Sequence, residues 1–220
     1  APDGTVTHQM VAPGINSFAF SKTGRLFASV CWYADVLFEL DPALVAAPRP
    51  VLDNLGWLKG IEFGADGKLY GASVLGGRIV RIDVEATPPT VETVASGFPA
   101  PFTAKFDSNG KLIVLDRSLS DVFRVDPADG SRELIAHFPF GVDNVAIGAG
   151  DRLFASSYSD GAVAEVLGDG TLRTLLPGGM IMPSVPALRQ RSDGESLYVA
   201  NMFGLREYDA ATGALRSTER

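Results

Sequence analysis

Cysteine and histidine are scarce in this sequence. Cys31 is the single cysteine, so no disulfide can form within the chain, and we expect this side chain to pack as a small apolar group at the end of a strand. The sequence contains no pair of cysteines with zinc-binding spacing. Its two histidines are His8 and His137. A structural zinc site and a disulfide framework are therefore excluded by composition.

Long apolar runs and basic blocks are also missing. No stretch approaches the roughly 20 apolar residues that a membrane-spanning helix needs. The net charge is −7, with 26 acidic against 19 basic residues, so nucleic acid is not an expected partner. We expect a soluble protein with a small-molecule ligand and no membrane partner. The sequence leaves open whether it is cytoplasmic, periplasmic or secreted.

One short pattern is present five times. Each copy has a small turn, followed by a leucine and a small or aromatic residue. The leucines are Leu26, Leu69, Leu112, Leu153 and Leu197. A period of about 43 residues, with short alternating apolar runs between Gly, Asp, Asn and Pro turns, is typical of a β-propeller with one four-stranded blade per repeat. The sequence therefore predicts an all-β fold, a single β-propeller domain over 1–220.

The five repeats predict five complete blades and one additional strand. The blade limits are about 16–56, 57–98, 99–141, 142–179 and 180–220. Residues 1–14 resemble the outer strand of the fourth repeat and are predicted to be an orphan outer strand. We therefore expect a six-bladed parent that is incomplete here, with self-association where the ring is open. A closed five-bladed ring remains the alternative, because natural proteins avoid exposed sheet edges.

Two of the predicted inner strands resemble a known family. The segments are 15–26, which reads INSFAFSKTGRL, and 142–147, which reads VDNVAI. Both are similar to stretches of the gluconolactonase and regucalcin family, which consists of six-bladed, metal-dependent lactonases. The resemblance implies that Asn16 and Asp143 bind a divalent cation, Ca²⁺ or Zn²⁺, at the mouth of the channel. It also implies hydrolysis of a small lactone or ester.

The chemistry of such a site is simple. A hard cation prefers carboxylate, amide and water oxygens. It would polarise the lactone carbonyl and lower the pKa of a bound water, while Asp143 would act as the catalytic carboxylate. The equivalent positions of the other repeats are Lys59, Phe102 and Pro186. We predict that Lys59, Phe102 and Asn144 bind the substrate.

Each of these residues also has a structural interpretation. Asn16 and the Asp143-Asn144 pair are residue types that are common in turns, and Lys59 can be a solvated or ion-paired residue of the channel. Asp116-Arg117 resembles the Asp-Arg turn of the NHL repeat, which ties the second strand to the third. The alternative function is accordingly a non-catalytic, NHL-like propeller that binds a small molecule or peptide at the channel mouth.

Several side chains outside these motifs can also be placed. We expect Glu62 to lie between blades, and both histidines to lie on or after outer strands, far from the channel. The loops that enter inner strands and those that leave second strands are expected on different faces. On that basis Trp32 and Tyr33 lie away from the mouth. Four loop residues would either line the mouth as an apolar rim or seal one blade against the next: Phe138, Phe140, Met180 and Met182.

Overall fold

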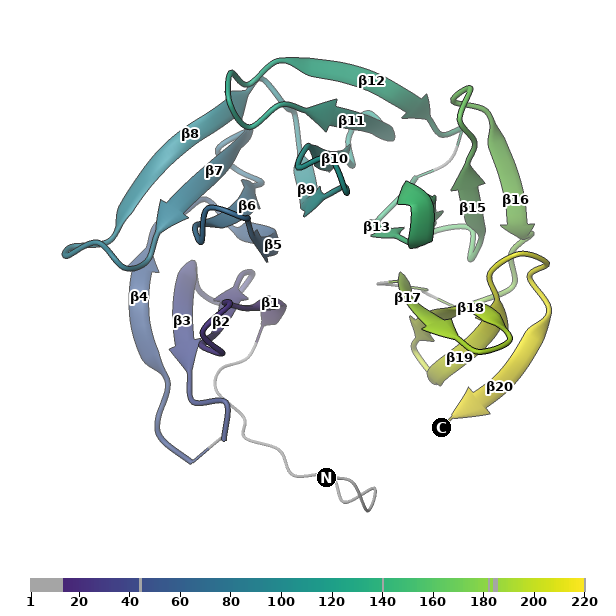
Figure 1. Cartoon of the computed structure of the whole chain (residues 1–220), viewed down its shortest axis with the longest axis horizontal. Helices are drawn as coiled ribbons and strands as arrows, with labels where there is room; N and C mark the ends of the chain where they lie inside the picture. The colour runs from purple at the N-terminus through teal and green to yellow at the C-terminus, as the bar shows by residue number, and fades with distance from the viewer. Residues whose placement is uncertain (1–13, 44, 140, 182, 184–185, 220) are drawn as a thin grey trace.

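The chain forms five antiparallel sheets of four strands each in the computed structural model (Figure 1). The structure describes residues 14–43, 45–139, 141–181, 183 and 186–219. The predicted orphan strand over 1–14 therefore falls almost entirely outside the described residues. Each sheet is built from consecutive strands, in the order expected for propeller blades. The prediction of five four-stranded blades is confirmed.

The strands occupy four positions in every blade, from the channel outwards. The inner strands are β1 (Ile15–Phe20), β5 (Leu58–Phe63), β9 (Pro101–Phe106), β13 (Asn144–Ile147) and β17 (Pro186–Arg191). The second strands are β2 (Leu26–Val30), β6 (Leu69–Ser73), β10 (Leu112–Asp116), β14 (Leu153–Ser156) and β18 (Gly194–Asn201). The third strands are β3 (Val36–Leu40), β7 (Arg78–Asp83), β11 (Asp121–Val125), β15 (Val163–Val166) and β19 (Gly204–Asp209). The outer strands are β4 (Arg49–Asp53), β8 (Thr90–Ser96), β12 (Arg132–His137), β16 (Leu172–Leu176) and β20 (Leu215–Glu219).

The recurring glycine turn explains why the repeats are so regular. Gly24, Gly67 and Gly110 join the inner strand to the second strand with φ angles of 82°, 77° and 75°. These left-handed conformations are readily adopted by glycine, which has no Cβ. In the fourth blade the same connection includes the three-residue 3₁₀ helix η1 (Ala149–Asp151). The described residues contain no helix that is long and apolar enough to cross a membrane.

The core lies between neighbouring blades. All five residues of β2, β6 and β10 are buried. Phe27 of the first blade packs with Leu58 and Val80 of the second, and Phe154 of the fourth packs with Leu197 of the fifth. Because successive side chains of a strand point to opposite faces, each blade contributes apolar groups to both of its neighbours. Burial of these groups provides the main driving force for stacking the blades.

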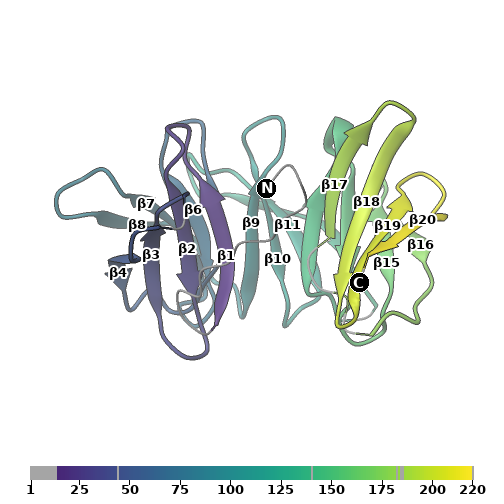
Figure 2. The same ribbon diagram turned by 90° about the horizontal axis from the view of Figure 1, so that it is seen from below.

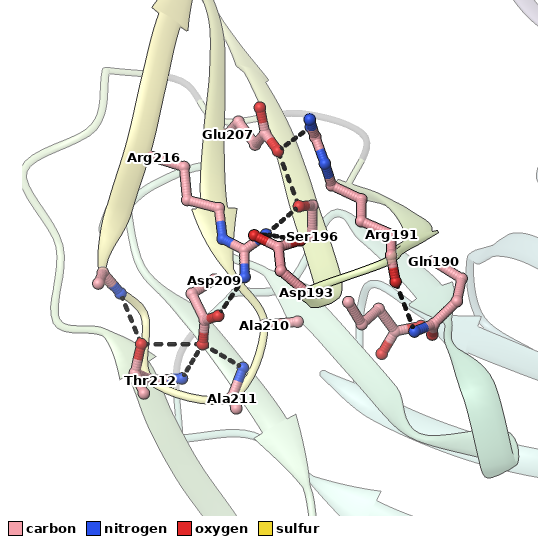
Figure 3. A network of polar contacts seen from close by, with 12 residues as sticks. Gln190, Arg191, Asp193, Ser196, Glu207, Asp209, Ala210, Ala211, Thr212 and Arg216 are labelled. Carbon is pink, nitrogen blue, oxygen red and sulfur yellow. Dashed lines mark hydrogen bonds and ion pairs between the residues drawn. The ribbon is translucent and has the colours of Figure 1, made fainter.

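The five blades form an arc that is open between the fifth and the first (Figures 1 and 2). At the opening, Phe18 and Phe20 of β1 are 68% and 57% exposed. The corresponding face of the fifth blade is polar, with a network that includes Arg191, Glu207 and Arg216 (Figure 3). The six-bladed parent and self-association at this opening remain predictions.

The strand register determines which loops share a face. Leu58 at the start of β5 pairs with Ser73 at the end of β6, and Asn144 at the start of β13 pairs with Ser156 at the end of β14. Loops that enter inner strands therefore lie on the same face as loops that leave second strands. The expectation that they open on different faces was wrong, because antiparallel pairing places the start of one strand beside the end of its partner.

Candidate functional site

Four residues from three blades converge at the start of the inner strands. They are Lys59 of β5, Phe102 of β9, Arg117 in the turn after β10, and Asp143, which directly precedes β13. We call this group the mouth cluster. Its members are linked by a series of contacts in space. Lys59 and Arg117 both lie over the Phe102 ring, and Arg117 also approaches Asp143. Three of the four are residues that the sequence placed at the channel mouth.

Lys59 is almost completely buried, with only 6% of the residue exposed. Its Nζ lies 4.0 Å from the centre of the Phe102 ring and 5.0 Å from that of Trp32. Burial lowers the pKa of Lys59 and the Arg117 charge adds to this effect, while the Asp143 carboxylate opposes it. The aromatic faces replace part of the hydration that the ammonium loses, because the ring quadrupole attracts a cation. This observation argues against a freely solvated Lys59.

Arg117 provides the second positive charge. Its Cζ lies 4.9 Å from the centre of the Phe102 ring, and its Nη1 lies 3.8 Å from Oδ1 of Asp143. The side chains of Arg117 and Asp143 are 41% and 21% exposed, so both can be reached from solvent. With Lys59 and Arg117 charged, the mouth cluster carries one more positive charge than negative.

Asp116 has the structural role that was predicted for the Asp116-Arg117 pair. It is completely buried, and its Oδ2 accepts a hydrogen bond from the Ala100 amide at 3.1 Å. Its Oδ1 accepts another from the Ser118 amide at 3.0 Å. These bonds hold the loop before β9 against the turn after β10. Arg117 differs from Asp116 because it extends from this fixed turn into the mouth cluster, a role that the sequence analysis did not assign to it.

Trp32 lies beside Lys59 and packs against a second tryptophan, Trp57. The ring centroids of Trp32 and Trp57 are 4.8 Å apart. Both residues adopt left-handed backbone conformations, with φ angles of 75° and 60°. The Asp35 carboxylate accepts hydrogen bonds from the amides of Gly56 and Trp57, which fixes the second of these loops. Bulky residues rarely adopt positive φ, and such strained positions are concentrated at functional sites.

The remaining predicted site residues are placed differently. Asn16 is exposed, and its Oδ1 accepts a hydrogen bond from the Ser17 hydroxyl at 3.3 Å. Asn144 is half-buried, and its Oδ1 accepts a hydrogen bond from the Val145 amide at 2.9 Å. Both contacts are local, as in the turn interpretation. Pro186 begins β17 and is buried.

A divalent cation does not fit the charges beside Asp143. The described residues contain no group of three or more His, Cys, Asp or Glu side chains that could hold a metal ion. The charged neighbours of Asp143 are Arg117 and Lys59, which repel a cation. The proposed ligand pair of Asn16 and Asp143 therefore remains a prediction from sequence resemblance.

The loop residues predicted to form a rim or a seal act as a seal where the structure describes them. Phe138 is 1% and Met180 is 7% exposed, and the Tyr208 hydroxyl contacts Sδ of Met180 at 3.5 Å. Phe140 and Met182 lie outside the described residues. His137 ends an outer strand, as expected, where its Nδ1 lies 2.7 Å from Oδ1 of Asp121.

The turns that leave the second strands, and not the loops named above, carry the exposed apolar side chains around the mouth. Every blade contributes at least one of them. They are Trp32, Tyr33, Leu75, Leu119, Tyr158, Met202 and Phe203. Because these turns share a face with the mouth cluster, the face combines an apolar border with a cationic centre. The sequence contained this signal, since each residue follows the same strand of its repeat.

No protein-family model and no curated protein matches the chain. Solved structures resemble it at the level of fold. A gluconolactonase from Xanthomonas campestris has a TM-score of 0.76 at 14% identity, covering 92% of this chain and 75% of that one. Virginiamycin B lyase from Staphylococcus aureus has a TM-score of 0.74 at 14% identity, covering 98% and 74%. A putative gluconolactonase has a TM-score of 0.74 at 18% identity, covering 99% and 81%. The chain thus has a gluconolactonase-like β-propeller fold.

Proposed function

We propose that this propeller binds a small lactone or ester at the mouth cluster and hydrolyses it. The observation that carries the proposal is the grouping of two cations over the Phe102 ring, with the Asp143 carboxylate beside one of them. The fold that the chain shares with gluconolactonases supports the same reaction class. Fold alone does not determine function, so the proposal depends on the chemistry of these side chains.

The mouth cluster has the groups that acyl-transfer chemistry requires. Hydrolysis of a lactone begins when water attacks the carbonyl carbon and negative charge develops on the carbonyl oxygen. The Lys59 ammonium and the Arg117 guanidinium would stabilise that charge. Asp143 would accept a proton from the attacking water and return it to the alkoxide that leaves when the ring opens. The product is a hydroxy acid, and its carboxylate would remain near the two cations.

The aromatic residues would position the substrate. Phe102 and Trp32 both contact the Lys59 ammonium and present apolar surface beside the charged groups. A small ring with one polar carbonyl would match this arrangement, since its apolar part contacts the aromatic faces and its oxygen approaches the cations. Asn144 stays a predicted contact because it directly follows Asp143.

The alternative is a propeller that binds a small carboxylate without turning it over. The Arg117–Asp143 contact favours this function, because an ion pair occupies the carboxylate that would otherwise act as the base. A carboxylate ligand would replace Asp143 beside Arg117. Saturable binding of a small carboxylate by protein that hydrolyses none of the compounds below would support this alternative.

Hydrolysis can be measured as acid release from a panel of five- and six-membered lactones and simple esters. We expect turnover by the wild type and a loss of about 10²–10⁴-fold in kcat for Asp143→Asn, the range for removal of a general base. Asp121→Asn is the matched control, since Asp121 contacts His137 at the end of an outer strand. The proposal fails if no compound is hydrolysed by folded protein or if the two variants behave alike. Elemental analysis of the wild type and of Asp143→Ala tests the predicted metal site separately.

A further inference from the structure

The inner strands have a second polar position, deeper than the mouth cluster. In each inner strand, one residue pairs with the residue that directly follows the repeated leucine. These inner-strand residues are Ala19, Glu62, Lys105, Ala146 and Ala187. Three blades thus have alanine where the second and third blades have a carboxyl group and an ammonium group. We call Glu62 and Lys105 the channel pair.

The channel pair borders two cavities. One, of about 360 Å³, is lined by three aromatic side chains, Phe18, Phe20 and Phe63, and by Ala19 and Ile61. The other, of about 340 Å³, extends towards Ile147 and Leu188 of the fourth and fifth blades. Glu62 and Lys105 line both cavities and are the only charged residues that line either within the described part of the chain. The charges therefore face an otherwise apolar channel.

Both charged groups have hydrogen-bonding capacity that the protein leaves unused. Oε2 of Glu62 accepts a hydrogen bond from the Phe106 amide at 2.8 Å, which fixes the carboxyl group between two blades as predicted. The Lys105 ammonium has no hydrogen bond or ion pair with any described residue. Burial raises the pKa of Glu62 and lowers that of Lys105, although the two groups attract each other. Both residues are half-buried, so their remaining hydrogen-bonding capacity is open to water or to a ligand in the two cavities.

We propose that the channel binds a small hydroxy acid with an apolar side chain. Its carboxylate pairs with the Lys105 ammonium, its hydroxyl exchanges a hydrogen bond with Glu62, and its apolar part packs against the phenylalanines and Ile147. A carboxylate ligand suits a lysine that has no hydrogen-bond acceptor among the described residues, because a charge-assisted bond is stronger than one to a neutral group. This site is separate from the mouth cluster and does not depend on hydrolysis there.

Calorimetric titration with 3-phenyllactate tests the channel site, because this compound has a carboxylate, a hydroxyl group and a phenyl ring. We expect one molecule to bind per channel, and Lys105→Met to weaken binding by about tenfold or more, as loss of a charged hydrogen-bond partner does. Glu62→Gln, which keeps an acceptor for the Phe106 amide, should weaken it less. Lys111→Met is the matched control, since Lys111 lies in the same blade and pairs with Asp126. Arg117→Met should retain the channel site.

Methyl NMR of the wild type provides a test that needs no variant. Bound 3-phenyllactate should shift the resonances of Ile61 and Ile147, which line the two cavities, and leave that of Ile79, buried within the second and third blades, unchanged. Absence of binding by the wild type would overturn the proposal. Equal affinity of Lys105→Met and Lys111→Met for 3-phenyllactate would also overturn it. The same holds if Arg117→Met no longer binds 3-phenyllactate while Lys105→Met binds it as the wild type does. Failure of lactone hydrolysis would leave these results unchanged.

Discussion

Lys59 and Phe102 form a close cation–π contact, with 4.0 Å between the lysine Nζ and the centre of the ring. The two residues occupy equivalent positions in two consecutive repeats, which form neighbouring blades. Their contact shows how a propeller assembles a site, since residues about 43 positions apart in sequence meet at one end of the channel. It also places a positive charge where little water can reach it, which has consequences for stability.

Replacing Lys59 with methionine should stabilise the protein at neutral pH. Because burial lowers the pKa of Lys59, its charged form is disfavoured in the folded state, and that penalty is fully present below the folded pKa. Folding becomes more favourable as the pH rises through the folded pKa towards the ordinary value of 10.5, since the unfolded chain then binds more protons. Urea unfolding should therefore show Lys59→Met as the more stable form at pH 7, with a difference that shrinks towards pH 10. A difference that is independent of pH would contradict this expectation.

Gly60 should be far less tolerant of substitution than other glycines with similar backbone angles. Its φ angle is 55°, and a Cβ added there would lie 2.5 Å from Cα of Thr103 in the next blade. Gly67 has a φ angle of 77° with nothing within 4 Å of such a Cβ, so it is the matched control. Gly67→Ala should lower the free energy of unfolding by about 1–2 kcal/mol through backbone strain alone. Gly60→Ala should cost about 1–3 kcal/mol more, because the blades must move apart. Equal costs in denaturant titrations would show that the inner strands pack more loosely than described.

Asp209 should stabilise the fifth blade over a defined range of acid pH. The hydrogen bond from Arg216 lowers the pKa of Asp209 to about 2, with further bonds from Thr212 (Figure 3). A carboxyl group with a depressed folded pKa contributes stability that is present above its unfolded pKa, near 3.8, and is lost as the pH falls through its folded pKa. Asp209→Asn should thus be less stable than the wild type at pH 5, and the gap should close between about pH 4 and 2.

Asp193→Asn is the control for Asp209→Asn. Asp193 lies 3.3 Å from the same arginine, but its side chain is 68% exposed, so solvent screens the interaction. Thermal unfolding at several pH values would measure both variants. If Asp193→Asn lost as much stability as Asp209→Asn, the importance assigned to the Asp209 hydrogen bonds would be wrong.

The fold was accessible from sequence because the turn chemistry repeats. A glycine with a left-handed backbone precedes Leu26, Leu69 and Leu112 by two positions, so both the period and the strand limits are visible in the residues themselves. The ends of the arc could not be judged in the same way. Phe18 and Phe20 fit the alternating pattern of a packed strand, yet they are exposed at the opening. The alternation of apolar residues within a strand does not indicate whether a neighbouring blade is present to cover them.

The site was only partly accessible. The sequence placed Lys59, Phe102 and Asp143 at the mouth because equivalent repeat positions converge at one end of a propeller, and their functional roles remain predictions. Arg117 was missed because its dipeptide with Asp116 matched a structural turn, and only the position of Phe102 shows where its side chain extends. Trp32 was missed through the error about loop faces. The channel pair was missed because Lys105 follows the alternating pattern of β9, and its lack of a partner becomes visible only in three dimensions.

The most direct test of the mouth cluster uses the protein's own fluorescence. The chain has two tryptophans: Trp32, which contacts Lys59 at the mouth, and Trp57, whose ring packs against that of Trp32. The Asp143→Asn variant, in which turnover is slow, is titrated with a lactone that the wild type hydrolyses, and its tryptophan emission is recorded. The emission should change in a saturable way. This change should be absent from the double variant that also carries Lys59→Met. Unchanged emission at concentrations that saturate hydrolysis would contradict the account, because the substrate would then bind elsewhere.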